Sequence, residues 1–373
     1  MKKFDLSIYK NYKMYLNYFD ILIKNETSNK ENFLERILIS PSSYRRAKKD
    51  NKKIGDQICS ELCTYFKLKI FDNAIIEELE EKINRIYYNF YYKNYELYDE
   101  DYAWINNMIK ENYVFNPIIQ LMKLLLDLSR TNNTNTIVSD SKDLYNELNK
   151  YKLFYSEELL EILEIASVLY EEKIDISNMF IYYKNEIAYN MLASRFNYEE
   201  KYLESVFFCN LAKQRFLQKE NFRRVYFINL ILLANYNALA AYKESYDLAF
   251  NQLLSIRYDI NYTYEFKATL KHYIIACVGM KKYNEVINEL INKEEINTTD
   301  MLALLISLYR TSKSKYKSYL EKMKTNETNE KFINYYIAID KYLEKGNKEA
   351  LNILYNYDIN KNLMKILKIK ENQ

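Results

Sequence analysis

Apolar residues recur at helical spacing along almost the whole chain, in runs rich in Leu, Ile and Tyr that short polar clusters separate. Only 3 Gly and 2 Pro occur among 373 residues, which leaves little to form tight turns or Gly-rich loops. The chain is too long for one small core, so a head with a repeat array, or two globular domains, are the natural arrangements. We therefore predict an all-α protein.

The first 69 residues predict four short helices. Asn29 is a suitable cap for the second of them. Ser40 and Pro41 are a strong start signal for the third, because Ser is a preferred cap and Pro is tolerated at the first helical position. The apolar stripes place the four helices at about 8–23, 30–38, 41–49 and 54–66.

The third of these helices, 41–49, is basic and has little to bury beyond Tyr44 and Ala47. A helix this short is not stable alone, so another part of the molecule must hold it. Short hydroxyl side chains in its first turn allow close approach to a groove, and the arginines after them can reach base edges or phosphates. We predict a helix-turn-helix with a packing helix behind it. The side chains expected to contact DNA are Lys30, Ser42, Ser43, Arg45, Arg46, Lys49, Lys52 and Lys53.

This segment resembles the helix-turn-helix of the lambda-repressor-like, XRE-type regulators. The matching residues are Ile39, Ser40, Pro41, Ser42, Ser43, Tyr44, Arg45 and Arg46, followed at the family's distance by Ile58, Leu62, Cys63, Phe66 and Leu68. The family has a Gln near the position of Lys30. It favours a small residue and a Gly at Leu34 and Leu38, and a Glu and a Gly at Lys48 and Asp50. These differences concern the tight turn between the two helices. The alternative to a DNA-binding helix is a basic face that is only solvated.

From residue 70 onward the chain predicts helix after helix. Residues 72–92 have a long apolar stripe and are expected to connect head and body. Helices are also expected over 118–128 and 159–170, with a polar loop over 132–141.

A signature recurs in the C-terminal half: an apolar helix, a short turn, and a second helix that opens with an aromatic residue and has a small or branched residue three positions later. Its copies begin at Tyr202, Tyr246, Tyr283 and Tyr316, with a weaker one at Asn347. The spacings bracket the period of tetratricopeptide repeats, whose hairpins stack into a right-handed α-solenoid. Gly279 and Gly346 are expected in turns between paired helices.

The predicted organisation is a helix-turn-helix domain over 1–69, a connecting helix over 70–97 and a tetratricopeptide-like domain over 98–373. The concave surface of such arrays binds extended peptides or partner helices. Asn229 and Asn235 lie in an otherwise apolar run, so at least one should be inside and needs a partner. The residues expected to face a bound peptide are Asn185, Tyr189, Tyr226, Asn229, Tyr236, Tyr273 and Tyr309. Ordinary hydrogen bonds between helices are the alternative for each.

Charge is distributed unevenly along the chain. Residues 1–69 carry 15 Lys and Arg against 8 Asp and Glu, and the remainder carries 39 against 43. A basic head on a mildly acidic body is the usual footprint of a modular DNA-binding protein. The N-terminus lacks the apolar run of a signal peptide, no stretch is apolar enough to span a bilayer, and the 4 Cys are scattered. We expect a cytoplasmic protein with reduced thiols and no membrane contact.

The sequence offers little for catalysis. His272 is the only histidine, so any Ser-His-Asp, Cys-His or two-His metal scheme would have to use it or fail. Cys59 and Cys63 lie one turn apart, but no second pair has the spacing of a metal site, and we interpret both as small core residues. Three Gly cannot build a phosphate loop or a dinucleotide fingerprint. We expect no enzyme, cofactor or metal.

A basic helix-turn-helix head joined to a tetratricopeptide-like body resembles the peptide-sensing transcription regulators of Gram-positive bacteria, the Rgg and PlcR group, and the arbitrium receptors of phages. The resemblance implies a homodimer that binds double-stranded promoter DNA and takes a short signalling peptide into the groove of its repeats, as in quorum sensing. We therefore expect a peptide-controlled transcription regulator. The alternative is a scaffold that holds a protein partner, with a head that has lost DNA binding through the changes at Leu34 and Leu38.

Overall fold

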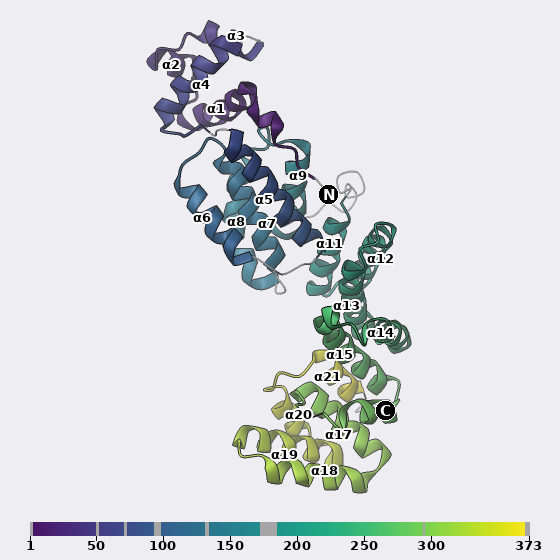
Figure 1. Ribbon diagram of the computed structural model, residues 1–373. Helices are drawn as coiled ribbons and strands as arrows, with labels where there is room; N and C mark the ends of the chain where they lie inside the picture. The colour runs from purple at the N-terminus through teal and green to yellow at the C-terminus, as the bar shows by residue number, and fades with distance from the viewer. Residues whose placement is uncertain are drawn as a thin grey trace. The chain divides into compact units, whose positions relative to one another are not determined.

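The structure, a computed structural model, is predominantly helical in its described residues (Figure 1). These residues are 3–49, 52–70, 73–92, 98–130, 134–171, 185–293 and 295–369. They form 20 α-helices, two short 3₁₀ helices and no strand, which confirms the all-α prediction. Within the same residues, no helix combines the length and apolar character needed to cross a membrane.

The chain divides into two compact units, Met1–Arg195 with Gln214–Arg224, and Phe196–Lys213 with Val225–Gln373. The first unit contains η1 (Ser7–Lys10), α1 (Tyr12–Glu26), α2 (Lys30–Arg36), α3 (Pro41–Lys49), α4 (Lys52–Phe66), α5 (Asn73–Tyr92), α6 (Tyr98–Lys110), α7 (Asn116–Arg130), α8 (Thr134–Asn149) and α9 (Glu157–Tyr170). Residues of both units occur in α11 (Glu186–Tyr198), α12 (Tyr202–Gln218) and α13 (Phe222–Ala238). The second unit continues with α14 (Tyr242–Ile256), η2 (Ile260–Tyr262), α15 (Thr263–Gly279), α16 (Tyr283–Leu290), α17 (Thr298–Thr311), α18 (Lys313–Asn326), α19 (Glu330–Lys345), α20 (Lys348–Leu354) and α21 (Lys361–Ile369). The domain boundaries expected from the sequence stay a prediction.

The N-terminal helices lie close to their predicted positions. Asn29 caps α2 by accepting a hydrogen bond from the backbone N–H of Asn32 at 3.1 Å, as expected. The first predicted helix is divided instead at Asn11, whose side chain accepts from the N–H of Lys13 and caps α1. The predicted polar loop over 132–141 is wrong, because Thr134 begins α8.

Aromatic residues of η1 and α1 pack against later segments of the first unit. The Tyr9 hydroxyl donates to the carbonyl oxygen of Phe154 at 3.0 Å and accepts from the N–H of Ser156 at 2.9 Å. The ring of Tyr9 meets those of Phe115 and Phe154 edge-on, at centroid distances of 5.3 and 5.2 Å. Tyr18 of α1 also packs on Phe154, so η1 and α1 share an aromatic core with the residues that precede α7 and α9.

Several helices end in a left-handed residue that is not glycine. The next residue then donates its N–H to a carbonyl five positions earlier, as Ile39 does to Leu34 at 2.8 Å. The same bond closes the turns after α4, α11, α12, α13 and α15. The left-handed residues in these six turns are Leu38, Lys67, Glu200, Glu220, Ala240 and Lys281. Because Gly is so scarce, ordinary residues occupy positions that usually favour it.

Gly279 and Gly346, the two glycines that follow the predicted head, have different roles in the structure. Gly346 ends α19 with φ +61°, as expected for a turn. The expectation for Gly279 is wrong: it is the last residue of α15, and the left-handed residue is Lys281. A Cβ at Gly279 would lie 2.4 Å from the Tyr242 ring, so this glycine permits close packing of an aromatic side chain.

The helical boundaries correct the register of the predicted repeat. Tyr202, Tyr242 and Tyr283 are the first residues of α12, α14 and α16, 40 and 41 residues apart. Tyr246, which the sequence pattern nominated, lies one turn inside α14. The residues three positions after the three opening tyrosines are all fully buried: Ser205, Ser245 and Val286.

Candidate nucleic-acid interface

Helix α3 has one buried and one exposed side. Tyr44 and Ala47 are buried, whereas Arg45, Arg46 and Lys49 are exposed. Tyr44 and Ala47 thus fix α3 against its neighbours while the cationic side chains project into solvent.

Hydroxyl groups line the start of α3. The Ser40 and Ser42 hydroxyl oxygens lie 2.7 Å apart, and the N–H of Ser43 donates to Ser40 Oγ at 3.4 Å. One Nη of Arg46 donates to Ser43 Oγ at 3.2 Å. These contacts hold Arg46 along the helix, and the bond to a neutral, exposed hydroxyl is weak enough for a phosphate or base to replace.

A carboxylate that the sequence analysis did not single out fixes the orientation of α3. Asp20 on α1 accepts a hydrogen bond from the Tyr44 hydroxyl at 2.8 Å and forms ion pairs with Lys30 on α2 and Lys48 on α3. Lys30 Nζ also lies 4.3 Å from the centroid of the Tyr44 ring. Burial alone would raise the pKa of Asp20, but hydrogen bonds from Lys30, Lys48 and Tyr44 outweigh it and hold the pKa below its usual value. Three helices therefore converge on one ionised side chain.

The cations of this region differ in how fully they are neutralised. Lys30 is half-buried and engaged by Asp20, which makes it the least available of the eight predicted DNA contacts. Arg45 pairs with Glu31 at 2.8 Å, but both side chains are about two-thirds exposed, so the pair is weak. Within the described part of the chain, Lys49, Lys52 and Lys53 make no ion pair. A hollow of about 400 Å³ between α2 and α3 is lined by five cations and only one carboxylate.

The turn before α3 keeps a tight geometry although the chain has no glycine there. Leu38 adopts φ +63° and leaves 93% of its side chain exposed. Leu34, where the resembled family has a small residue, is instead buried at 2% exposure. The backbone bond from Ile39 to Leu34 closes the turn, so the departures at Leu34 and Leu38 are compatible with two helices joined at a short corner.

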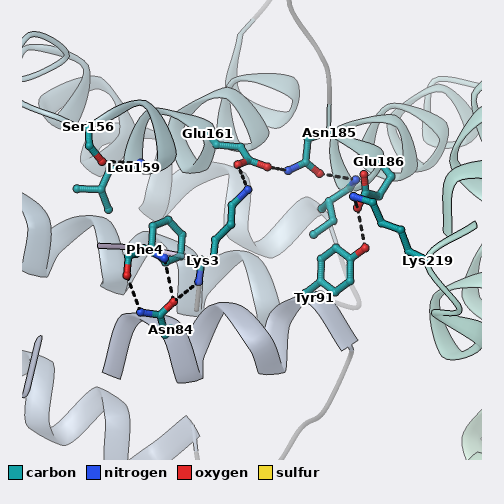
Figure 2. A network of polar contacts seen from close by, with 11 residues as sticks. Lys3, Phe4, Asn84, Tyr91, Ser156, Leu159, Glu161, Asn185, Glu186 and Lys219 are labelled. Atoms are coloured by element: carbon teal, nitrogen blue, oxygen red, sulfur yellow. Dashed lines mark hydrogen bonds and ion pairs between the residues drawn. The ribbon is translucent and has the colours of Figure 1, made fainter. Parts of the chain in front are cut away.

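The seven residues expected to face a peptide fall into two groups. Asn185, Tyr189, Asn229 and Tyr273 are buried, and Tyr226, Tyr236 and Tyr309 are half-buried. Asn185 belongs to a polar network of the first unit: its Nδ2 donates to Glu161, and its Oδ1 accepts from the N–H of Ile187 at 2.7 Å (Figure 2).

Polar side chains also pair inside the second unit. Asn235, fully buried, donates to Ser205 Oγ and accepts from Asn197, both at 2.8 Å. Asn229 donates to Gln252 Oε1 at 2.8 Å, which confirms the expectation that at least one of these two asparagines is inside and partnered.

Two tyrosines of the first group are also engaged. The Tyr273 hydroxyl donates to Glu285 at 2.5 Å, and the Tyr189 ring lies 4.9 Å from the Arg215 guanidinium. Contacts of this kind favour the interpretation that the buried residues join helices. Tyr226, Tyr236 and Tyr309 are more available to a ligand, and peptide binding stays a prediction.

Residues that could support catalysis lie in packed surroundings. Burial, with a smaller contribution from Lys271, lowers the pKa of His272 to about 4, and Asn237 donates to the His272 carbonyl oxygen at 3.2 Å. All four cysteines are buried thiols, and burial raises the pKa of Cys59 and Cys63 to about 12. Among the residues that the structure describes, no three potential ligands of the His, Cys, Asp or Glu type gather in a metal site.

Comparison with protein families, with curated proteins and with solved structures returned no match to this chain.

Proposed function

We propose that the chain is a transcription regulator whose N-terminal helices form a helix-turn-helix for double-stranded DNA. In this proposal α2 and α3 are the two helices of the motif and α3 is the recognition helix. The observation that carries the proposal is the outward projection of Arg45, Arg46 and Lys49 from a helix whose opposite side is buried. Short hydroxyls at the start of such a helix allow the backbone to approach a groove closely.

The contacts of Asp20 with Tyr44, Lys30 and Lys48, which we call the Asp20 clamp, support the assignment of α3 as the recognition helix. A recognition helix reads bases only if its angle to the rest of the protein is fixed, because a small rotation moves arginine tips away from base edges. Asp20 ties α1, α2 and α3 together through Tyr44, Lys30 and Lys48, and leaves the arginines outside the clamp. In this proposal Asp20 and its partners position α3, and the arginines contact the DNA.

The repeated hairpins of the C-terminal part support a second element of the proposal. We propose that they form a right-handed α-solenoid of tetratricopeptide-like units, which binds a short signalling peptide on its concave surface and lies in the cytoplasm as part of a homodimer. The recurring turn, with its left-handed residue two positions before each opening tyrosine, is the local basis for stacked hairpins. Peptide binding would change the spacing of the two heads and so the DNA sites that the dimer can span.

The experiment is selection from a pool of random-sequence duplexes by the full chain. The wild type should enrich a common sequence, and the double variant Arg45→Ala with Arg46→Ala should enrich none while keeping its circular dichroism spectrum. The matched control, Lys315→Ala with Lys317→Ala, removes the same charge from exposed positions on α18 and should select as the wild type does. Equal enrichment by the Arg45 and Arg46 variant would overturn the proposal.

One observation favours a scaffold as the second candidate. Helix α12 exposes Leu203 and Phe207, and α14 exposes Phe250 and Leu254, each pair four residues apart on one side of its helix. Exposed apolar pairs of this kind suit a protein partner. A scaffold would keep its partner at high salt, whereas DNA binding weakens steeply.

A further inference from the structure

A pocket of about 320 Å³ in the first unit has a wall of tyrosine rings. The rings come from consecutive turns of α5, at Tyr87, Tyr88, Tyr91 and Tyr92. Tyr87 and Tyr91 stack at a centroid distance of 6.1 Å, and Tyr88 and Tyr92 lie 4.6 Å apart. Such a wall offers a large apolar surface with polar edges.

Two ion pairs border the pocket. Lys3 pairs with Glu161, and Lys219 pairs with Glu186 at 2.6 Å (Figure 2). The Tyr91 hydroxyl also donates to Glu186 at 2.6 Å. Burial alone would raise the pKa of Glu186, but hydrogen bonds from Lys219 and Tyr91 outweigh it and lower the pKa, so this carboxylate stays charged. The pocket thus presents two cations and two anions beside aromatic rings.

We propose that this pocket binds a zwitterion of amino-acid size with an apolar side chain. The apolar side chain packs on the tyrosine rings, the ligand ammonium lies toward the carboxylates of Glu161 and Glu186, and the ligand carboxylate lies toward Lys3 and Lys219. Each ion pair presents one cation and one anion, so a singly charged ligand faces a like charge at either pair, whereas a zwitterion complements both charges of a pair. A volume of about 320 Å³ suits one amino acid better than a longer peptide.

The pocket is joined to the head by a short piece of chain. Asn84 on α5 accepts from the N–H of Phe4 at 2.9 Å and donates to its carbonyl oxygen at 2.9 Å, which fixes the segment that carries Lys3. That segment runs through η1 into α1, the helix of Asp20. A ligand that engages Lys3 therefore acts on the segment that anchors the head, and this regulatory part of the inference rests on the proposed function.

The test is calorimetric titration of the full chain with three probes: L-phenylalanine, 2-phenylethylamine, which lacks the carboxylate, and 3-phenylpropanoate, which lacks the ammonium. Phenylalanine should bind at least about tenfold more tightly than either analogue, because each analogue loses one charged contact. Equal binding of phenylethylamine would indicate a simple cation site and overturn the inference. Absence of phenylalanine binding would overturn it as well.

Two variants localise the binding. Tyr88→Ala removes a ring that is 44% exposed and should weaken phenylalanine binding about fivefold, whereas the control Tyr258→Ala, at a side chain that is 93% exposed in the second unit, should not. Lys219→Gln should weaken binding about tenfold. Equal affinity of the Tyr88 variant and the wild type would place the ligand elsewhere.

The regulatory part is measured separately, as DNA affinity with and without saturating phenylalanine. A change of at least about threefold supports it, and unchanged affinity with the pocket filled overturns it. Because the calorimetric titration needs no DNA, failure of the pocket and failure of the proposed function are distinguishable.

Discussion

Replacement of Asp20 by Asn should lower the stability of the head and strengthen its non-specific attraction to DNA. The carboxylate accepts from the buried Tyr44 hydroxyl and pairs with Lys30 and Lys48. Two partly exposed ion pairs contribute about 0.5 kcal/mol each, and replacing a charged acceptor by a neutral one costs the tyrosine bond about 1 kcal/mol. The free energy of unfolding should therefore fall by about 2 kcal/mol.

The assay for this loss is urea unfolding followed by tryptophan fluorescence. Trp104 is the only tryptophan and lies on α6 of the first unit, so its emission reports on the unit that contains Asp20. Asp56→Asn, at an exposed position on α4, is the matched control and should change stability by less than about 0.5 kcal/mol. An Asp20 variant as stable as this control would refute the clamp.

Asp20→Asn should also change the pH dependence of stability and the salt dependence of DNA binding. Because the folded pKa of Asp20 is lowered, its carboxylate stabilises the head above the usual pKa of an aspartate, and this contribution is lost as the pH falls through the folded pKa. The stability of the Asp20→Asn variant should therefore fall less in acid than that of the wild type. The substitution also frees Lys30 and Lys48 for phosphates, so the slope of log affinity against log salt should steepen by up to about 2. Weaker binding to a random-sequence duplex at low salt would contradict the reasoning.

Three further predictions concern stability, each measured by urea or thermal unfolding. Leu38→Gly should stabilise by about 0.5–1 kcal/mol because it relieves a left-handed leucine, whereas Leu153→Gly, also exposed but without positive φ, should not; no gain at Leu38 would contradict the strain. Gly55→Ala should cost about 2–3 kcal/mol, since the new Cβ would lie 2.2 Å from the Tyr12 ring. Gly346→Ala meets no atom within 4 Å and should cost only the backbone strain of about 1 kcal/mol; equal losses would refute the packing role of Gly55. Asn235→Ala should cost about 1–3 kcal/mol because it removes the amide that donates to Ser205 and accepts from Asn197, and the loss should be smaller when Ser205 is already Ala; strictly additive losses would exclude the network.

The helical class and most boundaries of the head could be predicted from the sequence because they depend on local signals. Spacing of apolar residues marks the buried side of each helix, and Asn29 marks a helix start through one short-range bond. The sequence pattern predicts Leu38 as the last residue of the second helix, whereas α2 ends at Arg36 and Leu38 is left-handed, a conformation that leucine seldom adopts. The signal that could have shown it is the scarcity of Gly, which forces other residues into such turns.

Contacts between residues that lie far apart in the sequence could not be predicted. Asp20 gave no local signal, and only the fold brings Lys30, Lys48 and Tyr44 to it. The same holds for Glu186 and Lys219, which the packing of helices brings together.

The assignment of asparagines and tyrosines to a ligand groove shows a related difficulty. Asn185 and Asn229 have side chains that suit a peptide backbone, yet the structure uses them to join helices, because a buried amide must find partners wherever it lies. The abundance of tyrosine has a similar explanation in part. Tyr9, Tyr44 and Tyr342 are core residues whose hydroxyls reach carbonyl or carboxylate oxygens.

The most direct test of the central proposal, that α3 meets a duplex, is the salt dependence of binding to a random-sequence duplex. The wild-type chain should lose affinity steeply between about 50 and 200 mM salt, and the Arg45→Ala, Arg46→Ala variant should show a slope shallower by about 2, because two phosphate or base contacts are gone. A slope that the two substitutions leave unchanged would contradict the account.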